Sequence, residues 1–172
     1  MKKFFIITVL AIASFSSSNA QVTWNIRVGG GLIEYDYSSY SSLVGWYDYS
    51  HEYEGAFVLA LESNIPFKRG KAFCLSPSVI GAIGGDTQEF IFPLLVGYKL
   101  KLSQKSLLIP KVGLNVVSFN YYGGDYNDHS VDVGPSVALS FEHKHFIMGF
   151  NGCFNVVEDV GSSYLLTLGY KF

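Results

Sequence analysis

The chain has 172 residues and a formal net charge of −2, from 12 basic and 14 acidic side chains. This small charge gives no basis for nucleic-acid binding, and the length suits one domain. Hydrophobic residues make up 49 % of the chain and aromatic residues 16 %. Because the apolar residues occur in short segments, never in the run of about 20 that a spanning helix needs, the composition favours a β protein.

The first twenty residues are typical of a cleavable export signal. Two lysines follow the initial Met, an apolar run occupies Phe4–Ala13, and the small residues Ser18 and Ala20 mark a cleavage site. The apolar run is shorter than the roughly 20 residues of a spanning helix. We therefore predict a signal peptide over residues 1–20 and a single exported domain over residues 21–172.

After the signal, apolar side chains recur at every second position, as expected of strands with one apolar face. In the C-terminal segment, for example, Tyr164, Leu166 and Leu168 alternate with Leu165 and Thr167. Segments of this kind lie at about 22–36, 57–61, 73–83, 89–102, 108–116, 131–142, 146–156 and 164–172. The pattern predicts eight strands.

Acidic and basic clusters also alternate along the chain, at the ends of successive predicted strands. Acidic clusters lie at 34–54, 86–89, 125–132 and 158–159, and the basic residues lie between them. A chain that passes four times from a basic end to an acidic end and back predicts an up-and-down meander with both termini at the basic end. The basic-end turns are short, whereas the first acidic-end connection, about 37–53, is predicted to be a long loop.

The alternation alone does not say which face points outward. A soluble carrier barrel would turn its apolar face inward and carry Lys and Glu along its whole exterior. Here the less apolar face is mostly Gly, Ser, Ala, Asn and Thr, which suits a narrow interior, so the bulky apolar face is predicted to contact lipid. A closed sheet also leaves no backbone group unpaired in hydrocarbon. We therefore predict an all-β fold, an eight-stranded antiparallel up-and-down transmembrane β-barrel.

The chain contains two cysteines, Cys74 and Cys153. The meander places them on the third and seventh strands, which face each other across the barrel, and at different heights. A disulfide needs Cα atoms within about 7 Å. We therefore predict two free, buried thiols.

At the C-terminal strand the chain resembles the small eight-stranded outer-membrane β-barrels, in which assembly machinery reads a final strand that ends in Phe. The matching residues are Tyr164, Leu166, Leu168, Tyr170 and Phe172. The segment Phe90–Tyr98 is similar to the fourth-strand pattern of the family called "outer membrane protein beta-barrel domain". The resemblance implies the outer membrane of a Gram-negative-type bacterium, contacts with outer-membrane lipids and with the barrel assembly machinery, and periplasmic termini. It implies little about activity.

On this register seven charged residues point into the basic half of the lumen. They are Arg27, Glu62, Lys99, Lys101, Lys111, Glu142 and Lys171. One interpretation is a narrow anion-preferring channel; the other is a plug of paired charges, because unpaired buried charge is costly. The plug is favoured, since the interior of an eight-stranded barrel is just wide enough for side chains. The excess of bases leaves room for water or a bound anion near the opening.

Catalysis has a weak basis in this sequence. Some eight-stranded outer-membrane hydrolases and acyltransferases modify lipids with His, Ser and an acid near the outer rim. The corresponding candidates are Asp128, His129 and Ser130, or His51 with Glu52 or Asp48. Adjacent residues of a strand point to opposite faces, so His129 and Ser130 meet only if the segment turns. We therefore predict that the protein is not an enzyme and has no catalytic or cofactor site.

Metal binding is not predicted either. Asp125, Asp128 and Asp132 offer carboxylates to a hard cation such as Ca²⁺, but their spacing matches no dedicated cation loop. The imidazoles of His143 and His145 lie in a predicted tight turn and make a weak pair of ligands.

The predicted function is that of a non-enzymatic outer-membrane barrel with a structural or adhesive role at the surface. The first outer loop, residues 38–51, is the best candidate for contact with an extracellular partner, because Tyr and Trp supply contact area at low entropic cost. Its contact candidates are Tyr40, Trp46, Tyr47 and Tyr49. The lipid-modifying enzyme and the narrow channel are the alternatives.

Overall fold

The computed structural model describes residues 22–41, 46–67, 72–122, 128–155 and 160–172. Within these ranges the side chains of 36–41, 46–51, 128 and 160 are not described. The predicted signal peptide, residues 1–20, lies outside the described residues. No helix within the described ranges is long and apolar enough to cross a membrane.

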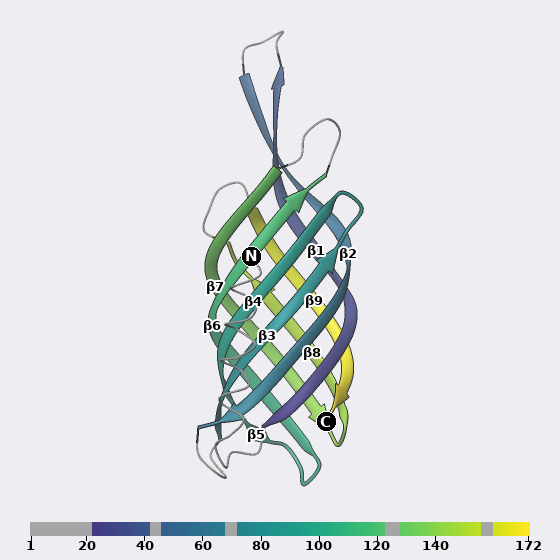
Figure 1. The fold of residues 1–172 in the computed structure, drawn as a ribbon, viewed down its shortest axis with the longest axis vertical. Helices are drawn as coiled ribbons and strands as arrows, with labels where there is room; N and C mark the ends of the chain where they lie inside the picture. The colour runs from purple at the N-terminus through teal and green to yellow at the C-terminus, as the bar shows by residue number, and fades with distance from the viewer. Residues whose placement is uncertain (1–21, 42–45, 68–71, 123–127, 156–159) are drawn as a thin grey trace, which may run out of the picture.

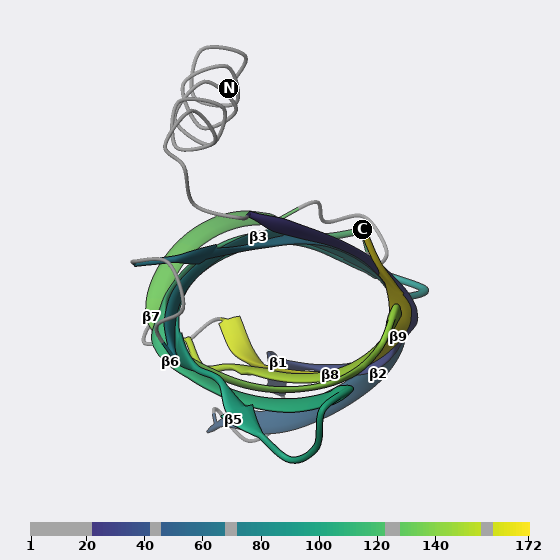
Figure 2. The same cartoon turned by 90° about the horizontal axis from the view of Figure 1, so that it is seen from below.

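The described strands form one antiparallel sheet that closes on itself (Figures 1 and 2). They are β1 Thr23–Ser41, β2 Trp46–Pro66, β3 Phe73–Ile83, β4 Thr87–Tyr98, β5 Leu100–Lys101, β6 Ser106–Tyr121, β7 Asp128–His143, β8 Phe146–Cys153 and β9 Val160–Lys171. Neighbours in sequence pair with each other except β4 and β5, β9 pairs with β1, and β4 pairs with β6. Because β4 and the two-residue β5 both pair with β6, they form one barrel strand. The predicted eight-stranded up-and-down barrel is confirmed.

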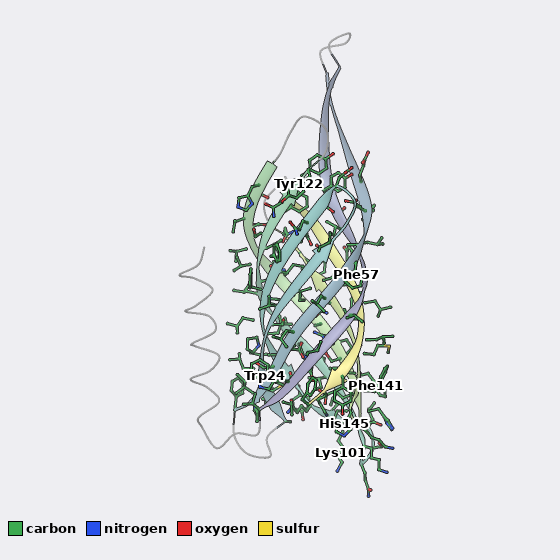
Figure 3. All side chains as sticks on the ribbon, turned by 45° about the vertical axis from the view of Figure 1, so that its right-hand side comes forward. Trp24, Phe57, Lys101, Tyr122, Phe141 and His145 are labelled. Carbon is green, nitrogen blue, oxygen red and sulfur yellow. The ribbon has the colours of Figure 1, made fainter. Side chains whose placement is uncertain are left out.

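The bulky apolar side chains point outward. Phe57, Leu59 and Leu61 of β2 are exposed, whereas Val58 and Ala60 between them are buried. Figure 3 shows Phe57 on the outer surface, and the same alternation runs along β4, β7 and β9. A soluble monomer rarely exposes contiguous apolar surface larger than a few hundred Å². The exterior is therefore that of a transmembrane barrel, and the predicted orientation of the two faces is confirmed.

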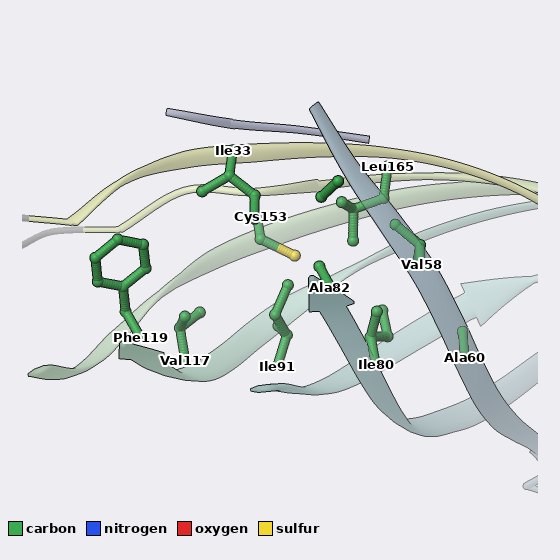
Figure 4. Close-up of a cluster of buried hydrophobic side chains, with 11 residues drawn as sticks. Ile33, Val58, Ala60, Ile80, Ala82, Ile91, Val117, Phe119, Cys153 and Leu165 are labelled. Carbon is green, nitrogen blue, oxygen red and sulfur yellow. The ribbon is translucent and has the colours of Figure 1, made fainter. Parts of the chain in front are cut away.

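The interior is less polar than the sequence predicts. Besides small residues it holds a cluster of large apolar side chains (Figure 4). Its larger members are Ile33, Val58, Ile80, Ile91, Val117, Phe119 and Leu165. Several of them lie within consecutive apolar residues, such as Phe90-Ile91-Phe92, so no polar neighbour marks them as inward-facing. Small residues alone would leave voids in the barrel, and voids forfeit the contacts that stabilise a packed interior.

The first acidic-end connection is not the predicted long loop. β1 and β2 remain paired as far as Ser41 and Trp46, and the resulting hairpin projects beyond the barrel in Figure 1. β1 pairs with β9 only as far as Tyr35, and β2 pairs with β3 only from Phe57. The frequent Tyr and Trp residues of this segment favour strands, a signal that its many acids and serines concealed.

Both cysteines are buried and free, as predicted. Cys74 lies on β3 and Cys153 is the last residue of β8.

The outward orientation can be tested with a charge at mid-height. Leu59 is exposed and pairs with Val28, near the middle of the barrel portion of β1. We expect Leu59→Arg to destabilise the barrel in lipid vesicles by about 2–4 kcal/mol, the cost of Arg at the bilayer midplane. Urea-induced unfolding, followed by heat-modifiable gel mobility, measures this cost. The control Gln104→Arg, at an exposed turn, should cost little; equal effects of the two variants would contradict the orientation.

Candidate functional site

Three charged side chains from separate strands meet in the lumen. Arg27 of β1 donates from Nη2 to Glu62 Oε2 over 3.0 Å, and Lys111 of β6 donates from Nζ to Glu62 Oε1 over 2.5 Å. None of the three side chains is exposed. Asn25 and Asn64 also donate to Glu62 Oε1, over 3.1 and 3.3 Å. Glu62 is therefore the common acceptor that cross-links β1, β2 and β6 inside the barrel.

The remaining predicted lumen charges lie apart from this cluster. Lys171 donates to Glu142 Oε2 over 2.6 Å, and Lys171 is partly exposed. Lys99 is half-buried, and Lys101 is exposed at the lower end of the molecule in Figure 3. Lys101 departs from the expected lumen position because β5, which carries it, pairs only with β6 among the described strands. Neither lysine forms an ion pair within the described residues.

Glycines make room for the buried guanidinium. A Cβ atom at Gly149 of β8 would collide with Arg27 Nη1, and one at Gly169 of β9 would lie 2.7 Å from Arg27 Cγ. The wall next to Arg27 is therefore free of side chains at two positions. No sequence pattern indicates this role, because the glycines and Arg27 are more than 120 residues apart and meet only when β9 closes against β1.

A second polar group lies in the other half of the interior. Glu89 of β4 is fully buried and accepts a hydrogen bond of 2.6 Å from the Ser163 hydroxyl of β9. The charge pattern assigns Glu89 to the acidic cluster at 86–89, whereas its alternation with Phe90 assigns it to the inward face, where the structure has it.

The apolar cluster lies between the charged cluster around Glu62 and the outer end. Ile33 follows Arg27 by six positions on β1, and Val58 precedes Glu62 by four on β2, so both lie nearer the projecting hairpin. Ile33, Val58, Ile80 and Ile91 are all completely buried. These side chains fill the bore and separate the charged cluster from the outer rim.

The base of the hairpin is held by described contacts. Tyr35 donates from its hydroxyl to Glu52 over 2.9 Å, and its ring lies 5.5 Å from that of Tyr121 on β6. Tyr53 donates to Glu34 over 3.1 Å. The carboxylate of Glu54 accepts hydrogen bonds from the turn between β3 and β4. The donors are Gly85 N, Asp86 N at 2.8 Å and Thr87 Oγ1 at 2.5 Å.

The predicted contact residues lie on the strands of this hairpin. Tyr40 is opposite Tyr47, Trp46 is opposite Ser41, and Tyr49 is opposite Ser38. Their side chains are outside the described ones.

Among the described side chains, the candidate catalytic residues His129 and Ser130 are not brought together. His129 and Ser130 are consecutive in paired strand β7, so their side chains take opposite faces. His129 is exposed, and its Nδ1 lies 3.1 Å from the carbonyl oxygen of Phe119. The side chains of Asp128, Asp48 and His51 are not described, whereas Glu52 is bonded to Tyr35.

The described residues hold no group of three or more His, Cys, Asp or Glu side chains able to bind a metal ion. Asp125 lies outside the described residues. Asp132 is buried, and its carboxylate accepts a hydrogen bond from Val133 N over 2.6 Å.

The residues of the predicted assembly signal share one face. Tyr164, Leu166, Leu168, Tyr170 and Phe172 are all exposed on the outer side of the barrel. Tyr170 packs at an angle on Phe172, with ring centroids 5.0 Å apart, and stacks on His145 at 5.3 Å.

No protein-family model and no curated protein matches this sequence. Several solved structures are similar in fold. Neisserial surface protein A (NspA) has a TM-score of 0.57 at 11 % identity, covering 86 % of this chain and 95 % of NspA. Ail, the attachment invasion locus protein of Yersinia pestis, has 0.51 at 12 % identity, covering 87 % and 98 %. The N-terminal β-barrel domain of Pseudomonas aeruginosa OprF has 0.53 at 9 % identity, covering 90 % and 100 %.

At such low identity these likenesses concern the fold alone. All three structures are small outer-membrane barrels. The closed antiparallel sheet is the feature that this chain shares with them. The chain thus has the fold of the small eight-stranded outer-membrane β-barrels.

Proposed function

We propose that this chain is an integral outer-membrane protein of a Gram-negative-type bacterium that acts, without catalysis, as a surface-interaction element through its β1–β2 hairpin. Residues 1–20 direct export, and the C-terminal strand is recognised by the barrel assembly machinery. The turns at the end opposite the hairpin are short, as periplasmic turns are in such barrels. The termini are accordingly periplasmic and the hairpin is outside.

The projecting hairpin carries this proposal. Beyond Tyr35 and before Phe57, β1 and β2 pair with each other and with no further described strand. The contacts of Tyr35 with Tyr121 and of Glu54 with the β3–β4 turn fix the base of the hairpin. A paired hairpin presents its aromatic residues on a preformed support, so a partner need not order a floppy loop on binding.

The composition of the hairpin indicates the kind of partner. Residues 34–56 contain five acids and no Lys or Arg, so a basic protein surface is complementary in charge. The segment also lacks Pro, and the lysines and prolines that usually protect a free strand edge are absent from it. An extended basic segment can therefore use main-chain hydrogen bonds to the unpaired edge as well as contacts to Tyr and Trp. The similar structure of Ail belongs to a protein named for attachment, which favours a surface role for this fold.

Adhesion of a non-adherent bacterial host that produces the protein tests the proposal. We expect the host to gain adhesion to a panel of immobilised extracellular-matrix proteins that includes basic ones. Tyr47→Ser combined with Tyr49→Ser should lower that adhesion several-fold, because the aromatic contact area is lost, while heat-modifiable mobility stays normal.

Tyr122→Ser is the matched control. Tyr122 is an exposed aromatic residue that follows β6, on the rim of the barrel and not on the hairpin strands. Its variant should adhere like the original protein. Equal adhesion of the double variant and the control would show that the hairpin is not the contact surface.

The filled bore argues against the channel alternative. The described interior contains a layer of Ile, Val and Leu side chains above the charged cluster, and an apolar layer of this kind excludes hydrated ions. We expect the folded protein to give no discrete conductance in planar bilayers, with insertion verified by heat-modifiable mobility. A conductance whose ion selectivity changes with Lys111→Glu would instead establish an anion path through the charged cluster.

The register of β7 weighs against one version of the enzyme alternative. A catalytic Ser or His needs a partner within hydrogen-bond reach, and His129 and Ser130 lie on opposite faces of β7. We expect overproduction of the protein to leave the lipid profile of the host identical to that of an empty-vector control. Lipids that change on overproduction and revert with His129→Ala or His51→Ala would contradict the non-enzymatic role.

A further inference from the structure

The charges of the buried cluster do not balance. Arg27 and Lys111 carry two positive charges, and Glu62 is the acid bound to both, with all three side chains fully buried. The Glu142–Lys171 pair is neutral by itself. Uncompensated charge in a low-dielectric interior is costly. Within the described interior, the cluster around Glu62 therefore has an excess of one positive charge.

The buried acid of the other half is too distant to form an ion pair with the cluster. Glu89 is bonded to Ser163, and Thr167, which lies opposite Gly149, follows Ser163 by four positions on β9. At about 3.3 Å per residue the two points on β9 are roughly 13 Å apart. The apolar cluster lies on the Glu89 side of the interior.

Unused hydrogen-bond donors gather beside the same cluster. Arg27 Nε and Nη1, Asn151 Nδ2 and Ser140 Oγ are buried and have no hydrogen-bond partner within the described residues. Arg27 Nη1 lies against Gly149. The register places Ser140 directly opposite Gly149, and Asn151 follows Gly149 by two positions on the same inward face. Donors from β1, β7 and β8 therefore surround one point of the wall.

We propose that the lumen binds one small monovalent inorganic anion, of the chloride type, beside Gly149. Arg27, Asn151 and Ser140 donate hydrogen bonds to it, and Lys111 adds to the positive field. Water would satisfy the donors but would leave the excess charge uncompensated. The excess of one positive charge in the cluster favours a monovalent anion over sulfate or phosphate. This site is independent of the proposed surface function.

The experiment uses the full-length folded barrel in lipid vesicles and chloride as the probe. Unfolding is measured as chloride replaces gluconate at constant ionic strength, because a ligand at concentration L that binds only the folded state stabilises it by RT ln(1 + L/Kd). We expect the free energy of unfolding to rise with the logarithm of the chloride concentration above Kd, with the slope of one bound ion. Ser140→Ala should weaken the apparent chloride affinity about tenfold, the effect of losing about 1.4 kcal/mol of binding free energy.

Ser136→Ala is the matched control, since Ser136 is an equally buried serine four positions earlier on β7 that bonds to the Gly152 carbonyl. Its chloride affinity should stay within about twofold of the original. Stability that does not depend on chloride, or equal responses of the two serine variants, would overturn the proposal.

Diffraction from crystals grown in bromide gives a second measurement that needs no variant. Anomalous density beside Gly149, within contact of Arg27 and Asn151, would support the site. Crystals with bromide elsewhere and none beside Gly149 would overturn it, even if Ser140→Ala failed to fold.

Discussion

The closure of eight strands into one sheet is the constraint on which the rest of the structure depends. In hydrocarbon every backbone donor and acceptor needs a partner within the protein, and the pairings of β9 with β1 and of β4 with β6 leave the barrel without an edge. Closure at this strand number also fixes an interior just wide enough for side chains. The interior must therefore be packed, and what fills it decides whether the protein can conduct, bind or only span.

This barrel fills its narrow interior in two different ways. Near the basic end a buried carboxylate, Glu62, holds two cations and two amides in place. Nearer the outer end, branched aliphatic side chains interlock as in the core of a soluble protein. The charged cluster depends on the pairing of opposite charges, whereas the apolar cluster depends on side chains whose shapes fill the space between them. Because the apolar layer lies on the outer side of the charged layer, it separates the buried charges from the outer rim. The excess positive charge of Arg27 and Lys111 over Glu62 therefore stays inside the protein.

The outer hairpin depends on contacts at its base, because its two strands pair mainly with each other. Its strands leave the barrel and keep only each other as described partners, an arrangement that is weak for an isolated pair in water. Hydrogen bonds between carboxylates and tyrosines at its base hold it against the rigid sheet. Glu54 adds a hydrogen bond to the neighbouring β3–β4 turn. The barrel thus serves as a support, and the segment available to other molecules is an extension of its own strands.

The sequence by itself determined the strand order, the face that meets lipid and the absence of a disulfide. Each follows from local patterns: a period of two in apolar residues, charge that alternates with chain reversals, and the distance between opposite strands. It also placed Arg27, Glu62 and Lys111 on the inward face. Only the tertiary structure decided that these three meet at one carboxylate, that Lys101 stays outside, and that Gly149 leaves space for a guanidinium 122 positions earlier in the chain. The physical reason is that parity along a strand fixes the direction of a side chain, whereas its height and its neighbours across the bore depend on the stagger of strands at closure.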